Sequence, residues 1–77
     1  MKLNLPPGYS VATYPSWFRI DRKDGSTALR CYNAANPSTP LQIRLYKNDA
    51  EESQALQFEN PAQQEQYINT LIQLGEL

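Results

Sequence analysis

Apolar and polar side chains alternate in three short stretches of this sequence, at residues 17–21, 27–33 and 41–47. In the third stretch, Leu41, Ile43 and Leu45 fall on one side, and the polar and aromatic residues between them fall on the other. Successive side chains of a strand point to opposite faces, so this pattern is typical of a strand with one face against a core. A slip of one residue would exchange the two faces, so the same pattern restricts how the strands pair.

The segments between these stretches indicate how they connect. Asp24-Gly25 is a turn signal between two alternating segments, which predicts a hairpin. Residues 9–14 form a further strand candidate, and Pro15 behind it indicates an edge, a bend or a bulge, because proline cannot donate to a strand ladder. Residues 34–40 have the composition of a loop. Residues 48–53 form an acidic loop in which 49–52 are compatible with one helical turn, and residues 54–59 form the last strand.

The C-terminal part of the chain has the pattern of an amphipathic helix. Asn60 is a good N-cap, Pro61 occupies the first helical position, and Gln63 can complete a capping box. An apolar stripe follows at helical spacing, and Gly75 suits the left-handed conformation that ends many helices. We therefore predict a helix over residues 61–74. The amide-rich face of this helix is expected to meet solvent or a partner; it comprises Gln63, Gln64, Gln66, Asn69 and Gln73.

Together these elements predict one α+β domain over residues 1–77. An antiparallel sheet of four to five strands carries the C-terminal helix on one face. The apolar sets of the strands are expected to face that helix; they are Phe18, Ile20, Leu29, Cys31, Ile43, Leu45, Leu56 and Phe58. Cys31 is thus expected to be a buried core residue rather than a reactive thiol.

The same alternation places one aromatic side chain and one arginine of each of three strands on the opposite face. These candidate binding residues are Trp17, Arg19, Arg30, Tyr32, Arg44 and Tyr46, with Arg22 and Lys23 at the hairpin tip as secondary candidates. Such a set suits three roles. It can stack nucleobases and hold phosphates, it can form a protein interface, or it can simply stabilise a half-solvated sheet through cross-strand and cation–π pairs.

Charge is distributed unevenly along the chain. Seven basic and two acidic residues lie in the first 47 positions, and six acidic residues with no basic ones follow, so net charges of +5 and −6 add to −1. A dedicated nucleic-acid domain is usually strongly basic, whereas a protein partner requires no net positive charge. The pI near 5.2 therefore favours a protein partner over a nucleic acid.

Catalytic and cofactor chemistry finds little support. The sequence has no histidine and only one cysteine, so we expect neither a zinc site nor a nucleophile with an imidazole base. Its three glycines stand alone, so no phosphate-binding loop is expected. We predict a protein that is not an enzyme and holds no cofactor or metal. No apolar run reaches the ~20 residues of a membrane span, and the single cysteine fits a reducing cytoplasm.

These observations favour a small cytoplasmic binding protein that docks its aromatic and arginine face onto a protein. Size and lack of chemistry are typical of phage or mobile-element accessory proteins, including inhibitors of host defence of the anti-CRISPR kind. The alternative is a single-stranded nucleic-acid-binding protein that uses the same face. A homodimer through this face or through an unpaired edge strand is also compatible with the pattern.

Overall fold

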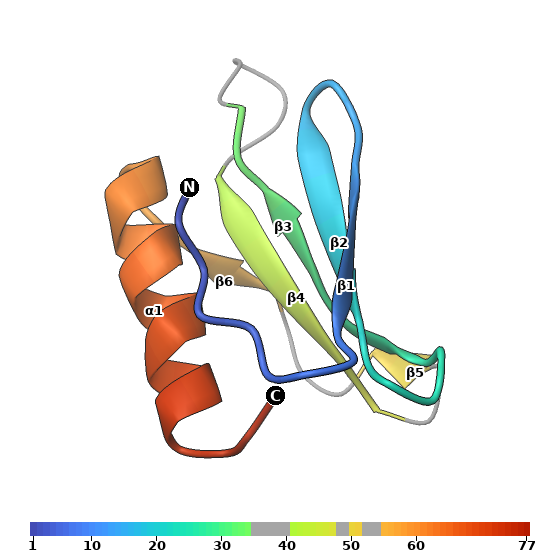
Figure 1. Cartoon of the computed structure of the whole chain (residues 1–77). Coiled ribbons are helices and arrows are strands. Elements are labelled where there is room, and N and C mark those ends of the chain that lie inside the picture. The colour runs from blue at the N-terminus through green and yellow to red at the C-terminus, as the bar shows by residue number, and fades with distance from the viewer. Residues whose placement is uncertain (35–40, 48–49, 52–54) are drawn as a thin grey trace.

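The computed structural model describes residues 1–34, 41–47, 50–51 and 55–77, and these form a β-sheet with one helix packed against it (Figure 1). The strands are β1 (Ser10–Thr13), β2 (Trp17–Asp21), β3 (Thr27–Tyr32), β4 (Gln42–Lys47), β5 (Ala50–Glu51) and β6 (Leu56–Gln57), and the helix is α1 (Pro61–Gln73). The predicted α+β class, an antiparallel sheet with a C-terminal helix, is confirmed. None of the described helical residues forms a segment long and apolar enough to cross a membrane.

The strands follow one another across the sheet in the order β1-β2-β3-β4-β5, and each pairs antiparallel with its neighbour. The two short strands share the far side of β4: β5 pairs with Tyr46 and Lys47, and β6 pairs with Gln42 and Ile43. Ala50 and Glu51 are therefore extended, which corrects the helical turn expected around them; the rest of that turn lies outside the described residues. At the other end of the order, β1 is the edge strand among the residues that the structure describes.

Two tight connections fix the register of the central hairpins. The Tyr14 N–H donates to the Trp17 carbonyl at 2.8 Å, which closes the β1–β2 turn through Pro15. The Arg22 N–H donates to the Ser26 carbonyl at 2.7 Å at the β2–β3 turn, where Gly25 takes a φ of 89°. A side chain at Gly25 would be strained in this left-handed conformation, so glycine is required there.

The core lies between the sheet and α1. Most buried side chains of this cluster come from the predicted inward positions of β2, β3 and β4 together with Ile68 of the helix; these strand residues are Phe18, Ile20, Leu29, Cys31 and Ile43. Ala28 of β3 was not predicted to face inward, but it is buried with them, next to the register shift in the β2–β3 pairing. Leu45 and Phe58 are partly buried against this cluster, as is Tyr67. Leu56 was predicted to face inward, but it is 38% exposed because β6 lies at the margin of the sheet.

The helix ends where its capping residues predict. The Asn60 side chain accepts a hydrogen bond from the Gln63 N–H at 2.9 Å, and the Gln63 side chain accepts one from the Glu59 N–H at 3.1 Å. At the other end, Gly75 has a φ of 72° and its N–H donates to the Ile72 carbonyl. A backbone N–H group at the start of the helix and a carbonyl group at its end, which would otherwise lack partners, are thereby hydrogen-bonded.

One residue of the predicted polar helix face is in fact part of the core. Gln64 is 0% exposed, and its amide nitrogen donates to the backbone carbonyls of Tyr32 (2.9 Å) and Gln42 (3.3 Å). These carbonyls belong to directly opposite residues of β3 and β4. The solvent position expected for Gln64 is therefore wrong: its amide attaches the helix to the sheet where these two strands meet.

Another amide of the same face binds the N-terminal segment. The Asn69 side chain accepts a hydrogen bond from the Asn4 N–H at 2.9 Å and donates to the Lys2 carbonyl at 3.0 Å. Residues 1–5 consequently run beside α1 (Figure 1), and Leu3 and Leu5 pack against the core. The segment thus covers part of the helix–sheet junction and leaves the opposite face of the sheet free.

Candidate binding face

The six predicted binding residues lie together on the sheet face that points away from α1. We call this surface the outer face; it comprises Trp17, Arg19, Arg30, Tyr32, Arg44 and Tyr46. Trp17 is directly opposite Tyr32, and Arg30 is directly opposite both Arg19 and Arg44 on its two neighbouring strands. All six side chains are half-buried, because each is flanked by side chains of the adjacent strands. Their role in binding stays a prediction.

Three aromatic rings form a continuous stack across the outer face. The Tyr14 and Trp17 rings lie 4.3 Å apart between centroids with planes 13° apart, and the Trp17 and Tyr32 rings lie 5.7 Å apart with planes 21° apart. The Arg44 guanidinium lies over the Tyr32 ring, 5.7 Å from its centroid. Tyr14 was not among the predicted site residues. The two-residue Pro15-Ser16 connection, which sets residues 14 and 17 opposite each other, was the signal for it.

Arg30 occupies the centre of the outer face. Its guanidinium carbon lies 5.4 Å from the Trp17 ring centroid and 5.2 Å from that of Tyr46. Contacts of this length between a cation and aromatic rings are attractive, at about 0.5–1 kcal/mol each where exposed. The Nε atoms of Arg30 and Arg44 are buried and have no hydrogen-bond partner within the described structure. The rings thus hold the cation of Arg30 in place without neutralising it.

Acidic neighbours compensate two of the three arginines. Arg19 donates to Asp21 at 2.9 Å, and Arg44 lies 3.3 Å from Glu51. The hydrogen bond and charge of Asp21 raise the pKa of Arg19 further above its usual value. Arg30 forms no such ion pair with any described acidic residue. The outer face together with Asp21 and Glu51 therefore carries three positive and two negative side chains, with the excess charge at its centre.

The two secondary candidates differ in what they contact. The Arg22 guanidinium donates to the backbone carbonyls of Thr27 (2.8 Å) and Tyr46 (2.7 Å), so it connects the hairpin tip to β4. Lys23 is exposed, and its side-chain methylenes lie beside Gly8. Arg22 is thus engaged in holding the fold, whereas the ammonium group of Lys23 lies at the surface.

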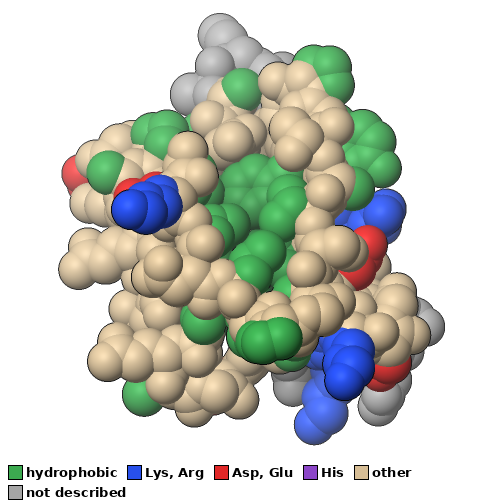
Figure 2. Space-filling model, in the orientation of Figure 1, with side chains coloured by type: hydrophobic (Ala, Val, Ile, Leu, Met, Phe, Trp, Pro, Cys, Tyr) green, Lys and Arg blue, Asp and Glu red, His purple; other side chains and the backbone are tan. Residues whose placement is uncertain are grey.

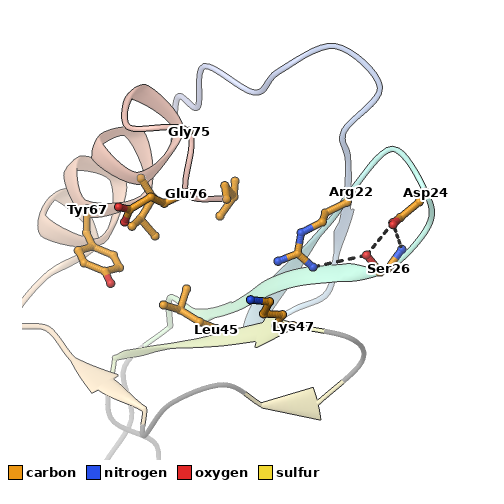
Figure 3. Close-up of a pocket in the computed structure, with 10 residues that line it drawn as sticks. Arg22, Asp24, Ser26, Leu45, Lys47, Tyr67, Gly75 and Glu76 are labelled. Carbon is orange, nitrogen blue, oxygen red and sulfur yellow. Dashed lines mark hydrogen bonds between the residues drawn. The ribbon is translucent and has the colours of Figure 1, made fainter.

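A separate hollow of about 590 Å³ lies between the helix C-terminus and the hairpin tip (Figure 3). Its lining mixes the basic side chains of Arg22 and Lys47 with Asp24, Glu76 and the Tyr67 ring. Burial, and secondarily the charge of Glu76, raises the pKa of Tyr67, so its hydroxyl stays protonated at neutral pH. Within the part of the chain that the structure describes, no group of three histidine, cysteine or acidic side chains is arranged to hold a metal ion.

Comparisons with protein-family models, with curated proteins and with solved structures found no match for this chain.

Proposed function

We propose that this chain is a small binding protein without catalytic activity, which docks its outer face onto a protein partner in the cytoplasm. Tyrosine, tryptophan and arginine are the residue types that contribute most to protein interfaces. Here they form one surface, and their mutual contacts fix its side chains before any partner arrives. A side chain that is already held loses little conformational entropy on binding, which favours affinity.

The observation that supports a protein partner most is the occupation of the ring faces. Trp17 has the Tyr14 ring on one side and the Tyr32 ring on the other, and Arg44 covers the far side of Tyr32. Nucleobases bind single-strand platforms by stacking on free ring faces. The outer face offers a partner mainly ring edges, phenol hydroxyls and guanidinium groups. Such groups suit packing and hydrogen bonding in a protein interface.

The charge of the outer face supports the same choice. A partner carboxylate can pair with Arg30, the arginine without an acidic neighbour among the described residues. Affinity for single-stranded nucleic acid scales with the number of phosphates neutralised, with a slope of about −0.7 per contact against the logarithm of salt concentration. One uncompensated arginine supplies little of that term. We therefore expect a partner surface with at least one exposed Asp or Glu.

Arg30→Glu tests the proposal. The introduced carboxylate would lie between Arg19 and Arg44, its direct cross-strand neighbours, so it replaces repulsion between like charges by attraction and should leave the fold intact. Lys23→Glu is the matched control, because it makes the same charge change at an exposed position outside the outer face. We expect the wild-type protein and Lys23→Glu to capture the same partner from nuclease-treated host lysate, and Arg30→Glu to capture none. Equal capture by all three proteins would exclude the outer face.

Single-stranded nucleic acid remains the second candidate because one ring face is open. Tyr14 ends the stack and is 40% exposed, so a base can stack on its outer side. Binding there should change the fluorescence of Trp17, which contacts Tyr14, and should weaken steeply as salt is added. A titration with oligo-dT at low salt measures this. The partner is a nucleic acid if the oligonucleotide quenches Trp17 fluorescence saturably, if added salt abolishes this quenching, and if no protein is captured from lysate after nuclease treatment.

The identity of the captured protein decides the biological role. A phage or mobile-element inhibitor of host defence, of the anti-CRISPR kind, is a binding protein of this size that acts by covering a surface of its target. Capture of a component of such a system through Arg30 would support this role. Recovery of an unrelated enzyme or structural protein would contradict it and still leave the docking function in place.

A further inference from the structure

The edge of the sheet at β1 is short, but it lacks the charged side chains, prolines and bulges that commonly protect an exposed strand. Within the described structure β1 pairs with β2 alone, and its four residues, Ser-Val-Ala-Thr, include no charge and no proline. Exposed edges present unpaired N–H and carbonyl groups, and proteins commonly protect them with charged side chains, prolines or bulges. An uncharged, regular edge of this kind is suited to pairing with another strand.

The register of β1 shows which backbone groups are free. The Tyr14–Trp17 hydrogen bond marks a bonded pair, and bonded and non-bonded pairs alternate along antiparallel strands. Ala12 and Ser10 are therefore bonded to Arg19 and Asp21, their partners in β2. Val11 and Thr13 are the intervening residues, so their N–H and carbonyl groups point away from the sheet.

We propose that a second copy of this chain pairs with β1 through a two-fold axis at Ala12. The free positions lie one residue on either side of this axis, so the strand is complementary to its own antiparallel copy. Val11 would exchange two hydrogen bonds with Thr13 of the second copy, and Thr13 would exchange two with Val11 of the second copy. All four outward-facing groups of each strand would then be satisfied, and the two sheets would become one.

The side chains at this axis permit the close approach. The two Ala12 residues would form a non-hydrogen-bonded pair, in which the Cα atoms come within about 4.5 Å, and their methyl side chains do not obstruct this approach. On the helix side, Val11 is 43% exposed and lies at the rim of an apolar groove of about 350 Å³. The groove is lined by Leu3, Leu5 and Phe18 among others. Figure 2 shows a hollow on this side of the molecule in which hydrophobic side chains gather.

Charge also favours a second copy as the occupant. Neither β1 nor the lining of the groove contains a charged side chain, so the paired strands bring no charged side chains of like sign together at the two-fold axis. Pairing would cover the exposed part of Val11 with Thr13 of the other copy and would set the two grooves on the same side of one continuous sheet. The contact involves one short strand from each copy, which places it among the small and weak interfaces. We therefore expect a dimer that forms as the protein concentration rises.

Sedimentation velocity and amide hydrogen exchange test this dimer, at protein concentrations from about 10 μM to about 1 mM, which span weak association. We expect the sedimentation coefficient to rise with concentration. The amides of Val11 and Thr13 should become protected from exchange as it rises, whereas those of Ala12 and Tyr14 should be protected throughout, because they already bond to β2. A dimer through the outer face would leave Val11 and Thr13 unprotected and would overturn the proposal.

Two variants remove the contact in different ways. Thr13→Pro deletes one outward-facing donor without removing a bond to β2, and Val11→Lys places a charge at the covered edge. Each should keep the protein monomeric at about 1 mM, a loss of association of about tenfold or more. Leu74→Lys, at an exposed apolar residue near the helix C-terminus, is the control and should dimerise like the wild type. A wild type that stays monomeric at every concentration, or variants that still dimerise, would refute β1 pairing.

Discussion

Replacement of the buried amide Gln64 by an isosteric carboxylate tests how the helix is held to the sheet. Gln64 donates to two carbonyl oxygens, and it is fully buried. In Gln64→Glu an ionised carboxylate would face those two oxygens without a donor. A protonated carboxyl group can donate to only one of them. We therefore expect the introduced glutamate to have a pKa well above its ordinary value, owing to desolvation and to repulsion by the two carbonyl dipoles.

The size of the effect follows from linkage. Because the folded state holds the proton more tightly than the unfolded chain, stability is highest below the unfolded pKa and is lost as pH rises towards the folded pKa. For one proton, the free energy of unfolding changes by about 1.36 kcal/mol per pH unit between the unfolded and the folded pKa. If the folded pKa of the introduced glutamate lies at or above about 7, the variant loses up to ~3.4 kcal/mol of stability between about pH 4.5 and about pH 7. A domain of this length has a total stability of about 4–12 kcal/mol. The variant should therefore lose a large part of its stability at neutral pH.

Urea unfolding followed by Trp17 fluorescence provides the assay, at about pH 4.5 and about pH 7 for the wild type and the variant. At each pH, the free energy of unfolding of the variant is subtracted from that of the wild type, which removes the pH dependence that the two proteins share. Gln66→Glu is the matched control, because Gln66 lies exposed on the same helix. We expect the destabilisation by Gln64→Glu to grow by ~2–3 kcal/mol between the two pH values, and that by Gln66→Glu to stay within about 0.5 kcal/mol. A destabilisation by Gln64→Glu that is equal at both pH values would refute the proposed role of the amide.

Three further outcomes are expected. Burial raises the pKa of Cys31 to about 12, so a thiol reagent at about pH 8 should modify Cys31 only when the protein unfolds. Because the unfolded thiol ionises at lower pH than the folded one, the free energy of unfolding should fall as pH rises above 9. A rapid reaction of the folded protein with the reagent would contradict the burial of Cys31. Arg22→Met should lower the free energy of unfolding in urea by about 2 kcal/mol, since it removes charge-assisted hydrogen bonds to two backbone carbonyls, one in β3 and one in β4. Lys23→Met, the control, should change the same free energy by less than about 0.5 kcal/mol. Equal effects of the two substitutions would show that Arg22 does not hold the hairpin. Asn60→Ala should cost about 1 kcal/mol through loss of the N-cap, and Asn60→Asp should retain most of the stability; an unchanged denaturation midpoint in Asn60→Ala would contradict the capping bond.

Local patterns in the sequence were sufficient to predict the main elements. Period-two alternation predicted the faces of β2, β3 and β4, and β2 has the predicted bounds, Trp17–Asp21. Asn60, Pro61 and Gly75 located the helix to within one residue of its observed end. These predictions succeed because strand alternation and capping depend on neighbours close in the sequence. The same alternation assigned all six candidate residues to one face.

Features that depend on distant contacts were missed. Gln64 has the same sequence context as the other amides of its helix, and only the approach of Tyr32 and Gln42 buries it. Leu56 fits the alternation but is exposed, because β6 is short and marginal. Arg22 appeared available to a partner until the fold brought the carbonyl oxygens of β3 and β4 within its reach.

The sequence by itself determined which residues share a face, because the two-residue repeat of a strand leaves no other arrangement that keeps apolar groups out of water. Tertiary structure alone decided what those residues contact. It places Arg30 between two rings, gives Arg19 and Arg44 acidic neighbours, and leaves β1 at an edge of the described sheet. The physical reason is that periodicity sets the direction of a side chain, whereas its neighbours across the sheet are set by strand order and register.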